Sequence, residues 1–215
     1  MEIKSKESCL FELKENGFTI LYNYWTPEKC QQAVEDLFSV PNHLFEKGQG
    51  GDLRFQHSNK YVSTANEFLN DGFIQDIAND YSSCNIADRV VGGIVKYSDG
   101  KIVDSGGSWH VDSEQSHQFK SLIYLNDVDT NNGPFTFIKK SKQLVEQLHK
   151  YSNLRILQET IDAQINTDNI IEITGKAGTC ILADSTYVHR GKQIKNGSRY
   201  TYTTYFYTEE SVNKD

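Results

Sequence analysis

Proline and methionine are rare in this sequence, and long apolar runs are absent. Only three prolines and one methionine occur among the 215 residues. No segment approaches the ~20 consecutive apolar residues that a membrane-spanning helix needs. The N-terminal segment MEIKSKESCLFELKENGF also lacks the apolar stretch of a signal peptide. These absences predict a cytoplasmic protein with no membrane partner.

Cysteine is sparse and widely spaced. Cys9, Cys30, Cys84 and Cys180 form no CxxC pair, which argues against a zinc knuckle and against a dense disulfide framework. We therefore expect four free thiols in a reducing compartment.

Basic charge is in deficit as well. Lysine and arginine number 22 against 29 acidic residues, which gives a formal net charge of −7. No stripe of basic residues occurs, whereas nucleic acids and anionic membranes attract proteins of positive charge. The sequence therefore favours a small molecule as the partner, and it leaves the oligomeric state open.

Aromatic residues, in contrast, are abundant. Twelve Tyr and eleven Phe suit a pleated, half-buried surface and favour β-strands. A length of 215 residues fits one domain with one sizeable core, and no repeat or linker divides the chain. We predict a single domain over residues 1–215.

Helices and one long loop are expected in the first part of the chain. Asn16-Gly17 would end a first helix, Phe18 to Tyr22 predicts a short strand, and Thr26-Pro27 begins a second helix. Residues 64–81 carry an apolar stripe at helical spacing. Residues 41–63, rich in Gly, Asn, Gln and His, predict a long loop, and such loops often serve as lids over a site.

From residue 89 onward, short apolar runs alternate with turn signals, and one helix, about Ser141–Lys150, interrupts them. This succession is typical of a jelly roll with helices packed on one face. We predict a mainly β fold, a cupin-like double-stranded β-helix with an N-terminal helical layer. The strands are expected at Val90–Tyr97, Ser108–Val111, Phe119–Leu125, Phe135–Ile138, Ile170–Ile173, Thr179–Leu182 and Tyr200–Tyr207.

A metal-binding pattern lies in His110-Val111-Asp112 together with the distant His189. On a strand, residues i and i+2 face the same side, so His110 and Asp112 can converge on one point. His189, from another strand, would complete a face of two histidines and one carboxylate. That face leaves positions open for a co-substrate and O₂ and is typical of non-haem iron(II) oxygenases. Taken alone, the HxD tripeptide is a weak signal and more often marks a polar surface pair.

Arg199 adds weight to this pattern. It lies ten residues beyond His189 and next to the strand expected at Tyr200–Tyr207. An arginine binds a carboxylate through two parallel hydrogen bonds and stays charged when buried. Because an unpaired arginine in a core strand would be costly, we predict that Arg199 binds a carboxylate of a dicarboxylate co-substrate.

Four segments resemble a known family in their order and spacing. They are WHVD, IYLND, NNGPFTFIKKSKQ and VHRGKQIKNGSRY. Together with the opening LKENGFTILYNYWTPEKC, they resemble the phytanoyl-CoA-hydroxylase-like branch of the iron(II)/2-oxoglutarate-dependent oxygenases. Some pieces are also similar to the prolyl-hydroxylase-like branch. The resemblance covers nearly the whole chain, but Gly191 stands where a serine is frequent and removes one possible hydrogen bond to the co-substrate.

The resemblance implies a dioxygenase that uses Fe(II), 2-oxoglutarate and O₂ and releases succinate and CO₂. Tyr124, in the YLN segment, and as a weaker candidate Tyr97, would support the co-substrate. Halogenating relatives have Gly or Ala at the carboxylate position, so Asp112 favours hydroxylation. The resemblance assigns the metal ligands and the co-substrate anchor to His110, Asp112, His189 and Arg199.

A small polar metabolite is the substrate we expect, because the chain leaves little room for a recognition domain. Arg54, Gln56 and Asn59 are candidate substrate contacts, although a solvated loop charge is the simpler interpretation of Arg54. Trp109 should pack on the opposite side of its strand from the ligands. Two alternatives stay open. A non-redox cupin-like ligand-binding or sugar-modifying protein is disfavoured by Arg199, and a nucleic-acid demethylase of the same superfamily is disfavoured by the acidic charge.

Overall fold

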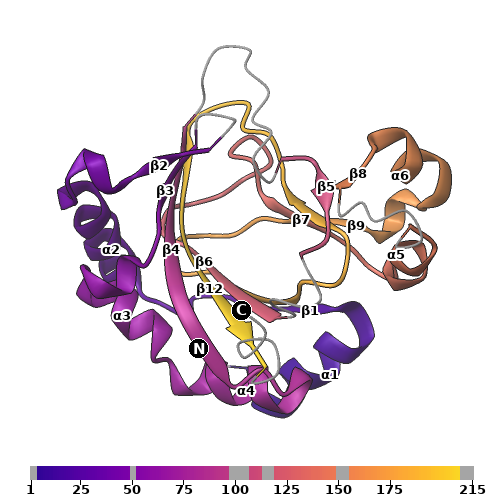
Figure 1. The fold of residues 1–215 in the computed structure, drawn as a ribbon, viewed down its shortest axis with the longest axis horizontal. Coiled ribbons are helices and arrows are strands. Elements are labelled where there is room, and N and C mark those ends of the chain that lie inside the picture. Colours follow the sequence, from indigo (N-terminus) through magenta and orange to yellow (C-terminus); the bar gives the residue numbers. More distant parts are fainter. Residues whose placement is uncertain (1–3, 49–51, 97–106, 113–118, 149–154, 209–215) are drawn as a thin grey trace.

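Two antiparallel β-sheets face each other at the centre of the molecule, and helices cover the outer side of the larger sheet (Figure 1). The computed structural model describes residues 4–48, 52–96, 107–112, 119–148 and 155–208. Within these residues, the larger sheet has seven strands in the order β1-β10-β6-β12-β4-β3-β2, and the smaller sheet has five in the order β8-β5-β11-β7-β9.

The strands are short except for the two at the middle of the larger sheet. The larger sheet consists of β1 (Phe18–Leu21), β10 (Cys180–Asp184), β6 (Phe119–Tyr124), β12 (Ser198–Tyr207), β4 (Ile86–Lys96), β3 (Leu53–Phe55) and β2 (Glu46–Lys47). The smaller sheet consists of β8 (Arg155–Ile156), β5 (Trp109–His110), β11 (His189–Gly191), β7 (Phe135–Ile138) and β9 (Ile170–Ile173).

The chain crosses between the two sheets at almost every step from β4 to β12. β4, β6, β10 and β12 belong to the larger sheet, whereas β5, β7, β9 and β11 belong to the smaller one. This winding is the double-stranded β-helix that the sequence predicted, and all seven strands expected from residue 89 onward are present. β4 begins earlier than predicted, at Ile86, and Tyr97 lies outside the described residues.

The helices begin and end where local chemistry directs. Helix α1 (Lys6–Asn16) ends at Gly17, whose φ of 84° is left-handed. Helix α2 (Pro27–Ser39) begins after Thr26, whose side chain accepts a hydrogen bond from the Lys29 amide. The single helix predicted over residues 64–81 is in fact two, because Asp71 starts a new helix by capping the Ile74 amide. The two are α3 (Ser63–Leu69) and α4 (Gly72–Ser82).

Two further helices and three short turns lie between the other elements of the described chain. α5 (Lys142–Leu148) and α6 (Gln158–Gln164) lie beyond the smaller sheet, at the right of Figure 1. Short 3₁₀ turns occur at Asn42–Leu44, Ser58–Lys60 and Thr167–Asn169.

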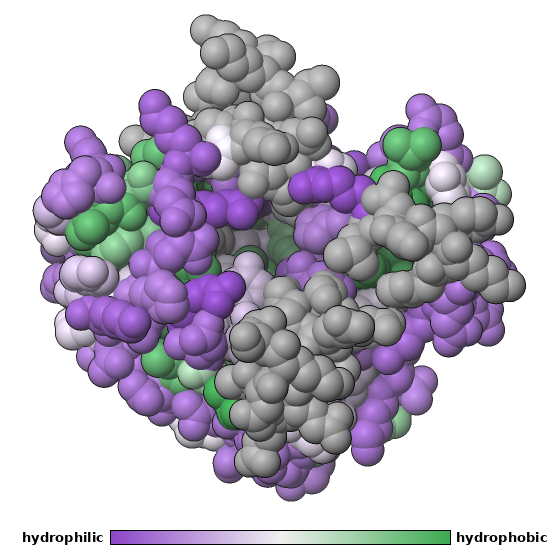
Figure 2. All heavy atoms as spheres, in the orientation of Figure 1, coloured by the Kyte–Doolittle hydropathy of each residue, from purple (hydrophilic) through white to green (hydrophobic). Residues whose placement is uncertain are grey.

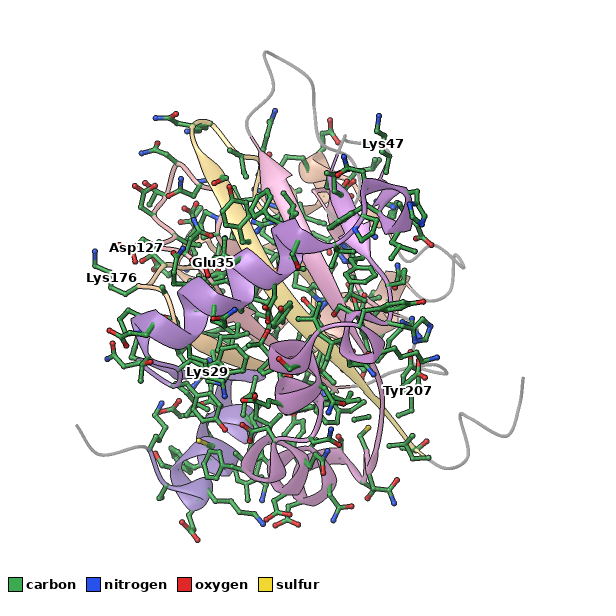
Figure 3. All side chains as sticks on the ribbon, turned by 90° about the vertical axis from the view of Figure 1, so that its left-hand side faces the viewer. Lys29, Glu35, Lys47, Asp127, Lys176 and Tyr207 are labelled. Carbon is green, nitrogen blue, oxygen red and sulfur yellow. The ribbon has the colours of Figure 1, made fainter. Side chains whose placement is uncertain are left out.

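The N-terminal helices pack on the outer face of the larger sheet, and α2 lies in front of its strands in Figure 3. Successive side chains of a strand point to opposite faces. Tyr202 and Phe206 of β12 therefore join this helical layer, where the Tyr202 ring makes a T-shaped contact with Trp25 and a tilted contact with Phe68. The alternate residues Arg199, Thr201, Thr203 and Tyr205 of β12 face the space between the two sheets. One strand thus supports both the core and the site.

The prediction of a long loop over residues 41–63 is wrong for much of that segment. β2 and β3 form an antiparallel hairpin, and β3 pairs with β4, Arg54 opposite Gly93. Phe55 is 1% exposed within the core cluster. The strands are too short to show an alternating pattern, and their partner β4 is distant in sequence. The hairpin extends the larger sheet, so this segment has a structural role.

Two absences can be stated for the described residues. No helix among them is long and apolar enough to cross a membrane. The cysteines are all buried and none forms a disulfide, which agrees with the expectation of thiols rather than bridges.

Candidate active site

A cavity of about 520 Å³ opens between the two sheets. Figure 2 shows the molecule hollowed near its centre, in the region between the sheets. The wall from the larger sheet follows the inward-facing side chains of β12, namely Arg199, Thr201, Thr203 and Tyr205. The smaller sheet contributes the two histidines that the sequence singled out.

The structure brings His110, Asp112 and His189 together in this cavity. Their potential ligand atoms all lie within 4.8 Å of one another. His110 on β5 and His189 on β11 are directly paired across the smaller sheet. Asp112 follows β5, and its carboxylate oxygens lie 3.8 Å from His110 Nε2 and 3.6 Å from His189 Nε2. Strand pairing therefore brings His189 beside His110 and Asp112, the candidate ligands that the sequence singled out.

Both histidines present a lone pair to the cavity. His110 Nδ1 lies 2.8 Å from the Ser108 carbonyl, and His189 Nδ1 lies 2.8 Å from the Tyr187 carbonyl. A carbonyl oxygen only accepts hydrogen bonds, so Nδ1 carries the proton and Nε2 is left as an acceptor or ligand. Burial, and then the positive charge of Lys120, lower the pKa of each imidazole. Two neutral imidazoles and one carboxylate form a donor set that fits iron(II).

Lys120 completes this cluster and was missed in the sequence. Its Nζ donates to Asp112 Oδ2 at 2.9 Å and lies 2.6 Å from His189 Nε2. The side chain is 8% exposed. The Lys120 ammonium therefore lies among the three predicted ligands, and this position is electrostatically favourable for a positive charge. The sequence signal that could have identified Lys120 was the alternation of side chains along β6. Lys120 and Leu122 face the cavity, whereas Phe119 and Ile123 face the helices.

Arg199 lies on the same cavity wall. Its Nη1 is buried and has no hydrogen-bond partner among the described residues. Burial lowers the pKa of the guanidinium, while the neighbouring Tyr124 and Asp52 act in the opposite direction. A guanidinium held in this way suits an incoming carboxylate.

Gly191 makes room for Arg199. A Cβ atom at Gly191 would lie 2.8 Å from Arg199 Nη2. The sequence alone suggested only that this glycine removes a hydrogen bond. In the folded chain, the missing side chain is what allows the guanidinium to lie against β11.

Tyr124 has a different position from the one expected. The residue is fully buried outside the cavity wall; its hydroxyl donates to the Ile173 carbonyl at 2.8 Å and accepts from the Phe135 amide at 2.9 Å. These bonds tie the two sheets together, since β6 belongs to one and Phe135 on β7 to the other. Tyr97, the weaker candidate, lies outside the described residues.

The three candidate substrate residues separate into two groups. Arg54 and Gln56 line the cavity, and Arg54 Nε donates to Asp52 Oδ2 at 2.7 Å. Asn59 is not part of the wall, because its side-chain oxygen accepts from the Val90 amide at 3.0 Å. Trp109 packs under the Arg190 guanidinium at 4.0 Å and is likewise absent from the wall.

The cavity is cationic although the chain is acidic. Its described wall carries six Lys or Arg side chains and two carboxylates. The six are Arg54, Arg89, Lys120, Arg155, Lys192 and Arg199, and the carboxylates are Asp52 and Asp112. Composition gave no sign of this, because net charge does not report how charges are distributed in space.

A family model and several solved structures resemble this chain. The family model described as phytanoyl-CoA dioxygenase (PhyH) matches residues 13–200. A search of curated proteins finds no match.

Three of the similar structures cover nearly all of the chain at low sequence identity. The epimerase SnoN in complex with Fe³⁺, alpha-ketoglutarate and nogalamycin RO is 11% identical with a TM-score of 0.69, over 94% of this chain and 83% of that one. HygX from Streptomyces hygroscopicus with nickel and 2-oxoglutarate bound is 13% identical with a TM-score of 0.67, over 96% and 88%. A Pseudomonas putida prolyl-4-hydroxylase is 11% identical with a TM-score of 0.64, over 95% and 100%. At these identities the likeness establishes the fold alone.

Proposed function

Because the chain belongs to the phytanoyl-CoA dioxygenase (PhyH) family, we propose that it hydroxylates a small polar metabolite with iron(II), 2-oxoglutarate and O₂. The family model spans residues 13–200 and therefore most of the fold. The sequence prediction of a 2-oxoglutarate-dependent dioxygenase is confirmed at the level of the family. The substrate, the type of oxidation and the individual residue roles are the parts that we propose.

We assign the metal to His110, Asp112 and His189, and the far carboxylate of 2-oxoglutarate to Arg199. The observation that carries this assignment is their convergence on one cavity, with two Nε2 lone pairs, a carboxylate and a buried guanidinium nitrogen that lacks a partner among the described residues. Iron(II), when bound, couples the conversion of 2-oxoglutarate and O₂ into succinate and CO₂ to oxidation of the substrate. The protein supplies the ligand set, the anchor and a site enclosed by two sheets.

The size and charge of the cavity favour a small substrate that carries negative charge. Its volume of about 520 Å³ lies within the range of small-molecule sites. Arg89 and Lys192 on its described wall pair with carboxylates outside the wall, but the other four cations still outnumber Asp52 and Asp112. This excess favours a carboxylate, phosphate or sulfate group on the substrate. SnoN and HygX have been crystallised with small molecules, which supports a small-molecule substrate. Asp112 in the ligand set favours hydroxylation over halogenation.

We also propose that residues 1–215 act as a single domain. β1, from the N-terminal helical layer, pairs with β10 of the jelly roll. The first and last parts of the chain therefore share one sheet, and separation would expose its edge.

The test is succinate formation by the iron(II)-loaded protein across a panel of small anionic, neutral and cationic metabolites, acyl-CoA esters and peptides. Substrate-dependent succinate with a small anion, together with a hydroxylated product, is the expected result. Binding of a metabolite with no succinate under any condition would instead support the non-redox cupin-like alternative. His110→Ala serves as the matched inactive variant, since it removes one proposed ligand and should abolish turnover.

A further inference from the structure

The Lys120 ammonium and a metal ion compete for one lone pair. His189 Nδ1 is engaged by the Tyr187 carbonyl, so its Nε2 offers a single lone pair. Lys120 Nζ lies 2.6 Å from that nitrogen and donates to it. A nitrogen lone pair that accepts this hydrogen bond is not available to a metal at the same time.

The fold directs Lys120 to this position. On β6 it is paired with Ala183 of β10 on one side and Tyr205 of β12 on the other, so the start of its side chain is fixed at the middle of the larger sheet. The ammonium lies 5.4 Å from the centre of the Phe135 ring. The whole residue is 6% exposed, and a buried ammonium needs an anionic or hydrogen-bonding partner. The candidate ligands provide that partner.

Asp112 and His189 differ in what they can share. Asp112 has two oxygens, so it can ligate a metal through one and keep Lys120 on Oδ2, where the bond is 2.9 Å. His189 has only Nε2 for both purposes. Metal binding therefore requires Lys120 to leave His189, but it does not require Lys120 to leave Asp112.

We propose that Lys120 competes with the metal for His189. Without metal, its ammonium holds Asp112 and His189 in place, and it must release His189 Nε2 before a metal can bind there. This inference rests on the proposed metal ligands. In the metal-free state, the ammonium compensates the Asp112 carboxylate, which is 14% exposed.

The proposal makes two opposite predictions for one substitution, Lys120→Met. This substitution keeps an unbranched side chain of nearly the same length and removes its charge. Without metal, the variant should be less stable, because the Asp112 carboxylate loses its cation. With metal, it should bind more tightly, because nothing occupies His189 Nε2. Simple structural damage at this strand would lower both quantities, so the pair of readouts separates the two explanations.

The experiment measures nickel(II) affinity by calorimetry and melting temperature with and without nickel(II). Wild type, Lys120→Met and Lys176→Met are compared on the full chain. Lys176 is a matched control because it also pairs with an aspartate, Asp127 at 2.7 Å, but at the surface, where its side chain is 81% exposed (Figure 3). This control removes the same charge from the molecule without touching the cavity.

For Lys120→Met we expect nickel(II) affinity to rise about tenfold or more and the metal-free melting temperature to fall by about 5–10 °C. Lys176→Met should leave the nickel(II) affinity and the metal-free melting temperature nearly unchanged, because it removes only a screened charge far from the cavity. Unchanged or weaker nickel(II) binding in Lys120→Met would overturn the proposal. His110→Ala distinguishes this failure from a wrong ligand assignment: if it binds nickel(II) like wild type, the proposed metal site itself is wrong.

Discussion

Replacing Arg199 tests whether this residue anchors the co-substrate. The substitution should lower the affinity for 2-oxoglutarate without lowering the stability of the fold. The Arg199 guanidinium is buried, and its Nη1 lacks a partner among the described residues. Burial lowers its pKa, which reflects the cost of holding the charge there. A group of this kind stabilises the complex with an anion rather than the empty fold.

The magnitude follows from the loss of one partner of a buried ion pair. That loss costs ~3–5 kcal/mol, and each ~1.4 kcal/mol corresponds to a tenfold change in affinity. Arg199→Met should therefore weaken 2-oxoglutarate binding by roughly two to three decades. Arg199→Lys should recover only part of this affinity, because an ammonium does not reproduce the planar fork of a guanidinium.

Stability without 2-oxoglutarate should not fall. A buried charge without a partner carries a desolvation cost that nothing offsets, and the uncharged Met side chain removes that cost. We expect the melting temperature of nickel(II)-loaded Arg199→Met to equal or exceed that of wild type, while the increase caused by 2-oxoglutarate disappears.

The assay is titration of 2-oxoglutarate into the nickel(II)-loaded proteins by calorimetry, with melting curves on the same samples. Arg190→Met is the matched control: Arg190 lies on β11 and packs on Trp109 at 4.0 Å, and it is not part of the cavity wall. A loss of stability in Arg199→Met with unchanged 2-oxoglutarate affinity would refute the reasoning and identify Arg199 as a structural residue.

Three other substitutions examine the site and its support. Asp112→Ala should lower metal affinity by at least about a hundredfold, since it removes the only carboxylate of the proposed set; calorimetry that returns the wild-type affinity would contradict the assignment. Gly191→Ala should weaken 2-oxoglutarate binding about tenfold, because the new Cβ would lie 2.8 Å from Arg199 Nη2; this effect should vanish in the Arg199→Met background. Phe55→Ala should destabilise the fold by ~3–5 kcal/mol in urea unfolding, as expected for a core residue that is 1% exposed; a negligible change would restore the view of residues 41–63 as a free lid.

Much of the architecture was encoded locally in the sequence. The strands from residue 89 onward are bounded by turn residues, and their apolar content marks them without reference to any partner. The start of α2 at Thr26-Pro27 and the end of α1 at Gly17 both depend on capping interactions within a few residues. Asp71 was a similar local signal, but the continuous apolar stripe around it concealed the break between α3 and α4.

The candidate metal ligands could be proposed from the sequence because a pair of ligands on one strand has a characteristic spacing. The spacing of His110 and Asp112 follows from the two-residue repeat of a strand. His189 and Arg199 were identified by resemblance and by the cost of burying an unpaired arginine. The structure brings His110, Asp112 and His189 within ligand distance of one another.

Other features depended on contacts between residues that are far apart in the chain. The β2–β3 hairpin exists because β3 finds β4, and the space at Gly191 matters only because Arg199 of another strand lies against it. Lys120 is 69 residues from His189, and no local pattern indicates that its ammonium would reach that imidazole. The sequence determined most strands of the jelly roll and which residue types could bind iron. Tertiary structure decided which charges converge on the cavity, because electrostatic and steric interactions act through distance in space and not through separation along the chain.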